Sequence, residues 1–81
     1  TVYYADRPTV VWSAGGALDW RRGATRMLGI DEVDRGQFGE RPRSVAFVTG
    51  CAMLLRLEWL ARVGDFEPRY FAYWEEVDWC V

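Results

Sequence analysis

The chain has 81 residues, of which 51% are hydrophobic and 16% aromatic, and it carries a formal charge of −2. It contains no histidine, and all ten basic residues are arginine. These absences exclude a Ser-His or Cys-His nucleophile pair, a histidine-ligated zinc and a lysine Schiff base. The twelve carboxylates are therefore the groups left for proton transfer. The near-neutral charge argues against a nucleic-acid partner.

The aromatic content is high for the length of the chain. A chain this short buries only about 60–65% of its unfolded surface, yet it holds five Trp, four Tyr and four Phe. Either it is a compact aromatic-rich module, or it is a piece of a larger fold whose remainder covers this surface. The apolar, amphipathic run at Trp79-Cys80-Val81 favours the piece. In that case we expect the isolated chain to self-associate.

The first half of the sequence predicts one strand and a long loop. Residues 9–14 are β-branched and aromatic and lead into Gly15-Gly16, which predicts a short strand followed by a turn. From residue 17 to residue 43 the pattern dissolves into glycines and charges, and only residues 24–28 could form a helical turn. A loop of this length is more often functional or disordered than neutral scaffold.

The second half predicts two apolar segments and two helices. Residues 44–49 form a strand candidate, and residues 51–56 are apolar on both faces, typical of a covered strand or a buried helix. Residues 57–63 change to the period of a helix with an apolar face, and Gly64 stands where a C-terminal cap is expected. A second helix is predicted to begin at Glu75.

The two cysteines show no metal or redox spacing. Cys51 and Cys80 are far apart in the sequence, and two cysteines do not make a disulfide framework. We interpret them as buried free thiols, which suits a reducing compartment. There is no transmembrane or signal-peptide pattern in the chain.

Three carboxylates open the second predicted helix. Glu75 and Asp78 are three residues apart and share a helix face, whereas Glu76 is rotated by about 100°. Acids clustered between aromatic residues suit a general base, because repulsion and desolvation favour proton uptake. Acids at a helix N-terminus also stabilise the helix itself, and that is an alternative explanation of the cluster.

Three motifs in sequence order resemble family 2 glycosyltransferases of the GT-A fold, especially rhamnosyltransferase-like members. The first is the Thr-Gly segment with its apolar run at residues 48–56, and the second is Val-Gly-x-Phe at residues 63–71. The third, residues 73–80, matches the family's Glu-Asp-x-Asp pattern before an apolar helix, with Glu at the second acid. The resemblance spans residues 45–81. It implies that residues 1–81 are an α+β portion of an α/β nucleotide-diphospho-sugar transferase domain.

The resemblance also implies roles for single residues. Glu76 corresponds to the general base that deprotonates the acceptor hydroxyl in an inverting transfer, and Glu75 and Asp78 match the flanking acids. Thr49 and Gly50 match the segment that approaches the substrate, although Gly50 alternatively relieves a bend in a strand. Trp74 either stacks on a sugar ring or is a core aromatic. The departure from the pattern is that the base is Glu rather than Asp, whose carboxylate lies closer to the backbone.

The family's nucleotide-binding half, with an Asp-x-Asp that holds a divalent metal, has no counterpart in these residues. The resemblance thus implies Mg²⁺ or Mn²⁺ in the full-length enzyme, bound outside this chain, and no metal within it. It also implies a nucleotide-sugar donor such as dTDP-rhamnose and a polysaccharide or lipid-linked acceptor in cell-wall or surface polysaccharide biosynthesis. The enzyme is expected in the cytoplasm or at the inner face of the membrane, and the isolated chain is expected to be inactive.

Two other functions remain open on the sequence. One is a carbohydrate-binding module without chemistry, in which exposed aromatic side chains stack on glycan. The other is an interaction domain whose acids only stabilise a helix.

Overall fold

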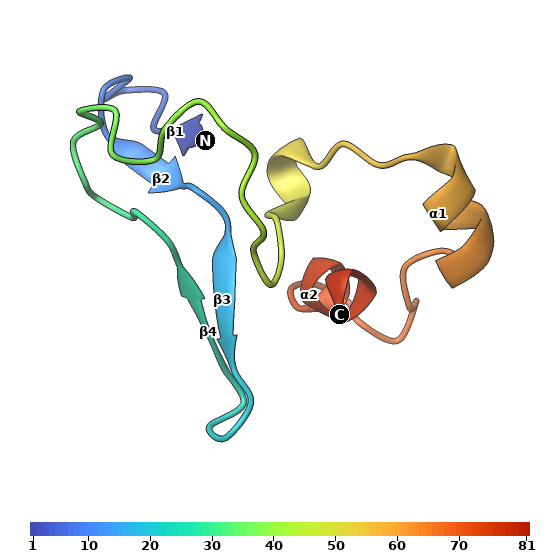
Figure 1. Cartoon of the computed structure of the whole chain (residues 1–81). Coiled ribbons are helices and arrows are strands. Elements are labelled where there is room, and N and C mark those ends of the chain that lie inside the picture. Colours follow the sequence, from blue (N-terminus) through green and yellow to red (C-terminus); the bar gives the residue numbers. More distant parts are fainter.

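The N-terminal half of the chain forms two antiparallel hairpins. In the computed structural model, which describes all residues 1–81, β1 (Val2–Tyr3) pairs with β2 (Val11–Ser13), and β3 (Gly16–Asp19) pairs with β4 (Ala24–Met27). The C-terminal half holds a 3₁₀ turn, η1 (Gly50–Ala52), and two helices, α1 (Leu57–Val63) and α2 (Glu75–Cys80). The chain is thus a small α+β structure whose strands and helices lie in separate halves (Figure 1).

The strand predicted over residues 9–14 is confirmed in its centre. Val11 and Ser13 of β2 are 0% and 2% exposed. The hydroxyl of Ser13 accepts a hydrogen bond from the backbone N–H of Gly15 at 3.2 Å, and Gly15 has a φ of +98° that favours glycine. The predicted turn therefore lies at Gly15, but Gly16 already belongs to the next strand.

The prediction of an irregular loop over residues 17–43 is wrong in its first part. β3 and β4 form a hairpin with Gly16 opposite Met27 and Asp19 opposite Ala24. The Asp19 carboxylate caps the connecting turn by accepting N–H bonds from Arg21 at 3.0 Å and Arg22 at 3.3 Å. The helical turn expected at residues 24–28 is also wrong, because β4 gains its backbone hydrogen bonds from β3.

The two apolar segments after residue 43 are not strands. Phe47 makes only an isolated bridge to Gly16, through an N–H bond from Gly16 to the Phe47 carbonyl at 2.8 Å. A Cβ built on Gly16 would lie 2.1 Å from the Phe47 ring, so this close approach requires glycine. Residues 51–56 form neither a strand nor a buried helix, and Leu54 is 98% exposed. The prediction fails because no second strand pairs with these segments.

Both predicted helices are confirmed. Gly64 caps the C-terminal end of α1. Its φ is +91°, and its backbone N–H donates a hydrogen bond to the Leu60 carbonyl at 2.9 Å. Its apolar face is not covered, because Trp59 and Val63 remain 47% and 54% exposed. The indole N–H of Trp79 in α2 donates to the Gly64 carbonyl at 2.8 Å and ties the two helices together. No helix in the chain is both long and apolar enough to cross a membrane.

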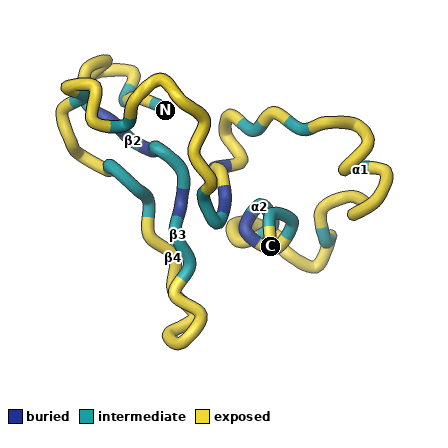
Figure 2. Tube along the Cα trace, viewed as in Figure 1, coloured by how far each residue is buried: buried dark blue, intermediate teal, exposed yellow.

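The buried core is very small. Only six of 81 residues are buried, and Val11, Phe47 and Val77 are the large apolar ones among them. Figure 2 shows buried positions at β2, in the segment before η1 and in α2, with exposed chain between them. The accessible surface of 6633 Å² exceeds the value of about 5,000 Å² typical of a folded monomer of this mass. The structure therefore leaves much apolar surface uncovered.

The cysteines are both free thiols, but the prediction that both are buried is wrong. Cys80 lies in α2 and is partly covered, whereas Cys51 is exposed.

A side-chain hydrogen bond from Tyr3 to Asp34 joins β1 to the loop after β4. It raises the pKa of Tyr3 above its ordinary value of 10.0 and, together with the Gly36 N–H, lowers the pKa of Asp34 below its ordinary 3.8. Because the pKa of Tyr3 is higher in the folded state, this group stabilises the fold below pH 10, and the stabilisation is lost as pH rises through the folded pKa. Because the pKa of Asp34 is lower in the folded state, this group stabilises the fold above pH 3.8, and the stabilisation is lost as pH falls through the folded pKa.

We therefore expect this contact to persist across the neutral range and to break at both extremes of pH. The measurement is an NMR titration of the Asp34 carboxyl in the original chain and in Tyr3→Phe. In Tyr3→Phe the pKa of Asp34 should rise toward its ordinary value, with part of the depression kept by the Gly36 N–H. An unchanged Asp34 pKa in that variant would contradict the contact.

Candidate active site

Two consecutive residues in left-handed backbone conformation lead into α2. Tyr73 has a φ of 68° and Trp74 a φ of 73°, with ψ of −16° at Trp74. This conformation costs a non-glycine residue about 1–2 kcal/mol, and such strain often occurs at functional sites. The Trp74 carbonyl then accepts the helical hydrogen bond from Asp78 N–H at 2.8 Å. The strained bend thus sets where the first turn of α2 points its carboxylates.

Glu75 and Glu76 each bury one carboxylate oxygen that has no hydrogen-bond partner. Both Oε2 atoms are shielded from solvent, although the residues are only partly buried. A carboxylate oxygen is an acceptor only, so these two atoms have unused acceptor capacity, but a hydroxyl group reaches them only after neighbouring side chains move. A general base must lie within hydrogen-bond reach of the proton that it takes, and Glu75 and Glu76 are candidates because no group of the chain occupies these carboxylate oxygens.

The turn that begins at Gly50 lies close to Glu76. A Cβ built on Gly50 would lie 3.7 Å from Cβ and 4.0 Å from Cγ of Glu76. Thr49 beside it is 7% exposed, and its hydroxyl lies 3.7 Å from the sulfur of Cys51. The structure therefore brings Thr49, Gly50 and Glu76 together, although they are distant in the sequence.

The alternative explanation of Gly50, relief of a bend within a strand, does not fit. Gly50 starts η1 rather than lying in a strand, and its φ is not among the positive ones. An added Cβ would make ordinary van der Waals contacts with Glu76. The fold therefore does not require glycine at this position.

We expect Gly50→Ala to leave the free energy of unfolding within about 1 kcal/mol of the original, because the backbone is ordinary and space is available. Thermal unfolding followed by circular dichroism measures this. Gly16→Ala is the matched comparison, and it should destabilise more because its Cβ would overlap the Phe47 ring. Equal losses in the two variants would show that Gly50 is structural after all.

Asp78 lies in different surroundings from the two glutamates. It is exposed and lines a cavity of about 350 Å³ with Glu67, Arg69 and Tyr70. Arg69 donates to Glu67 from its backbone N–H at 3.0 Å and from Nη2 at 3.1 Å. These bonds lower the pKa of Glu67. The sequence analysis did not predict the Glu67–Arg69 ion pair. The signal for it was the Glu-Pro-Arg tripeptide, which places opposite charges two residues apart.

The three acids do not converge on one point. No group of three or more Cys, Asp or Glu side chains has an arrangement that could hold a metal ion. The divalent cation that the resemblance implies for a complete enzyme is expected outside this chain, so these carboxylates are not its predicted ligands. Trp74 is 43% exposed and is not a core aromatic, so its ring is accessible beside Glu75.

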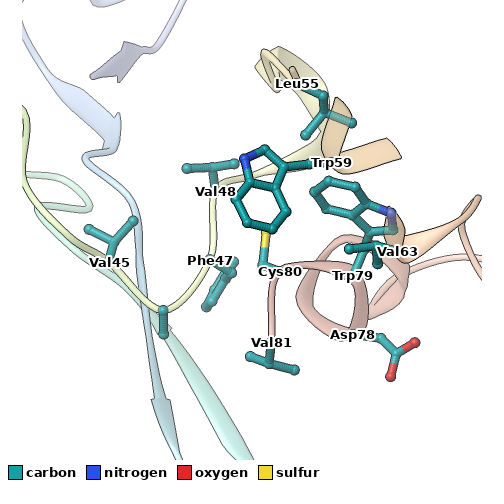
Figure 3. Close-up of a pocket in the computed structure, with 11 residues that line it drawn as sticks. Val45, Phe47, Val48, Leu55, Trp59, Val63, Asp78, Trp79, Cys80 and Val81 are labelled. Carbon is teal, nitrogen blue, oxygen red and sulfur yellow. The ribbon is translucent and has the colours of Figure 1, made fainter. Parts of the chain in front are cut away.

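An apolar groove of about 530 Å³ runs between residues 45–48, α1 and α2. Figure 3 shows Phe47, Trp59 and Val63 around it, together with Trp79 of α2 and Val81, which follows α2. Asp78 is its one charged lining residue. Sequence reasoning did not locate this groove, because it forms only when three separate segments meet.

Protein-family models, curated proteins and solved structures were each compared with the chain, and none of them matches it.

Proposed function

We propose that the chain is the acceptor-side part of an inverting glycosyltransferase of the GT-A fold, with Glu76 as the general base. The proposal is supported by the three sequence motifs at residues 45–81. The observation that carries it is the proximity of Glu76 to Gly50, together with a Glu76 carboxylate oxygen that has no hydrogen-bond partner. We place this enzyme in the cytoplasm or at the inner face of the membrane, acting on glycan or lipid-linked acceptors.

The proposed reaction is a single displacement at the anomeric carbon of a nucleotide sugar. The acceptor hydroxyl donates its proton to the Glu76 carboxylate while its oxygen forms the new bond to carbon. The bond from that carbon to the nucleoside diphosphate breaks, and the leaving group keeps the electron pair. The partial burial of the Glu76 side chain strengthens a hydrogen bond from the hydroxyl to its carboxylate, because water competes less. The exposed Trp74 ring offers an apolar face for the acceptor sugar.

The test is a transfer assay on the full-length polypeptide that contains this sequence, with a panel of nucleotide sugars that includes dTDP-rhamnose. We expect acceptor-dependent release of nucleoside diphosphate and inversion at the anomeric carbon, seen by NMR of the product. The isolated 81-residue chain should show no turnover. Retention of configuration, or turnover by the isolated chain, would contradict the proposal.

The exposed aromatic side chains favour a second candidate, a carbohydrate-binding module without chemistry. Phe71 is 103% exposed, Tyr73 80% and Trp74 43%, and all three lie just before α2. In that case the isolated chain binds oligosaccharides, and Trp74→Ala weakens this binding. Binding in the absence of any transfer by the full-length polypeptide would favour this candidate over the enzyme.

A further inference from the structure

A second cleft in the N-terminal half is lined by arginine. It has a volume of about 390 Å³ and lies between Gly15, at the end of β2, and the loop that carries Phe38, Arg41 and Arg43. A neighbouring hollow of about 490 Å³ also includes Phe38 and both arginines. The two guanidinium groups thus border a space of the size typical of small-molecule sites.

An aromatic ring contacts one of the two arginines. Arg41 and Arg43 flank Pro42, and both line the cleft. The guanidinium carbon of Arg43 lies 5.9 Å from the centre of the Phe38 ring. Phe38 in turn packs on Gly29, where a Cβ would lie 2.4 Å from the ring. The cleft is therefore anchored to the strand half.

Both guanidinium groups lack a partner within the chain. The ion pairs of the structure involve Arg7, Arg22, Arg56 and Arg69, and neither Arg41 nor Arg43 pairs with a carboxylate. Their backbone N–H groups donate no hydrogen bond either. Glu40 is the one acid that lines the cleft, so its side chains carry a net positive charge.

We propose that this cleft binds the diphosphate group of an organic phosphate ester. A guanidinium group donates two parallel hydrogen bonds to a phosphoryl group, so two arginines match two phosphoryl groups. Val45 and Val48 supply apolar wall for the organic part of the ligand. The inference rests on the cleft alone and stands whether or not the chain belongs to a glycosyltransferase.

The test is an NMR titration of the 81-residue chain with inorganic pyrophosphate at low ionic strength. The variant Arg41→Gln/Arg43→Gln should bind about tenfold or more weakly, because it loses charge-assisted hydrogen bonds. The control, Arg21→Gln/Arg26→Gln, removes the same charge at exposed positions of the β3–β4 hairpin and should change affinity by less than about twofold. Equal losses in both variants, or no binding by the original chain, would overturn the proposal.

Uridine diphosphate and farnesyl diphosphate distinguish the two sources of the group, a nucleotide and an isoprenoid lipid. Tighter binding of either one than of pyrophosphate supports the site and identifies its ligand class, and equal binding shows that the diphosphate alone is recognised. In each case the affinity should fall in Arg41→Gln/Arg43→Gln. Binding of either ligand that is unchanged in this variant would refute the cleft as the site.

Discussion

Glu76→Gln in the full-length polypeptide is expected to lower the rate of sugar transfer by a factor of about 10² to 10⁴, the contribution of a general base. The amide keeps the size of the side chain but takes no proton from the acceptor hydroxyl. Because the resemblance places the donor site outside this chain, donor binding should be unaffected. Steady-state kinetics with separate measurement of donor affinity checks this result.

Glu75→Gln is the matched control for this prediction. Glu75 is the adjacent residue, it also buries one unpartnered carboxylate oxygen, and the change in charge is the same. Glu76, not Glu75, is the residue next to Gly50, so Glu75→Gln should lower the rate of transfer clearly less than Glu76→Gln. A larger loss in Glu75→Gln than in Glu76→Gln would transfer the role of base to Glu75. Near-normal turnover of Glu76→Gln with intact donor binding would refute the assignment.

The isolated 81-residue chain is expected to self-associate at micromolar concentrations. Its surface exceeds that of an ordinary folded monomer by roughly 1,600 Å², which is about twice the area of about 800 Å² that each partner buries in a standard-size protein interface. The apolar groove lined by Phe47, Trp59 and Val63 is where we expect the contact, because it is the largest apolar hollow described. Analytical ultracentrifugation over a range of concentrations measures the association.

Val63→Asp should weaken this association about tenfold or more, because it loses apolar burial and places a charge in the contact. Trp20→Asp is the control, since Trp20 is 76% exposed but lies in the turn of the β3–β4 hairpin, outside the groove. It should leave the association constant nearly unchanged. A stable monomer at high concentration, or equal effects of the two variants, would contradict the prediction.

The helices could be predicted because their signals are local. The apolar spacing of residues 57–63, followed by Gly64, is sufficient for a short helix with a glycine at its end, and the acids at Glu75, Glu76 and Asp78 suit a first helical turn. β2 was also predictable from its β-branched residues before Gly15. These elements satisfy their backbone hydrogen bonds nearby, or with a single neighbouring strand.

The errors concern segments whose structure depends on a partner. Residues 24–27 carry no strong strand pattern and became β4 only because β3 lies opposite, with Asp19 closing the turn. Residues 44–49 have a strand pattern but remain irregular, because Phe47 finds only Gly16 to bridge. Apolar pattern alone therefore predicted neither which segments pair nor which stay exposed.

The sequence by itself determined the chemistry available to this protein. With no histidine and no lysine, proton transfer falls to carboxylates, and the acids at Glu75, Glu76 and Asp78 stand out as a cluster. The tertiary structure decided which of them meets Gly50, which one turns toward Glu67 and Arg69, and that two arginines line a separate cleft. The reason is physical: residue types and their local spacing are properties of the chain, whereas burial and neighbours depend on contacts between distant segments.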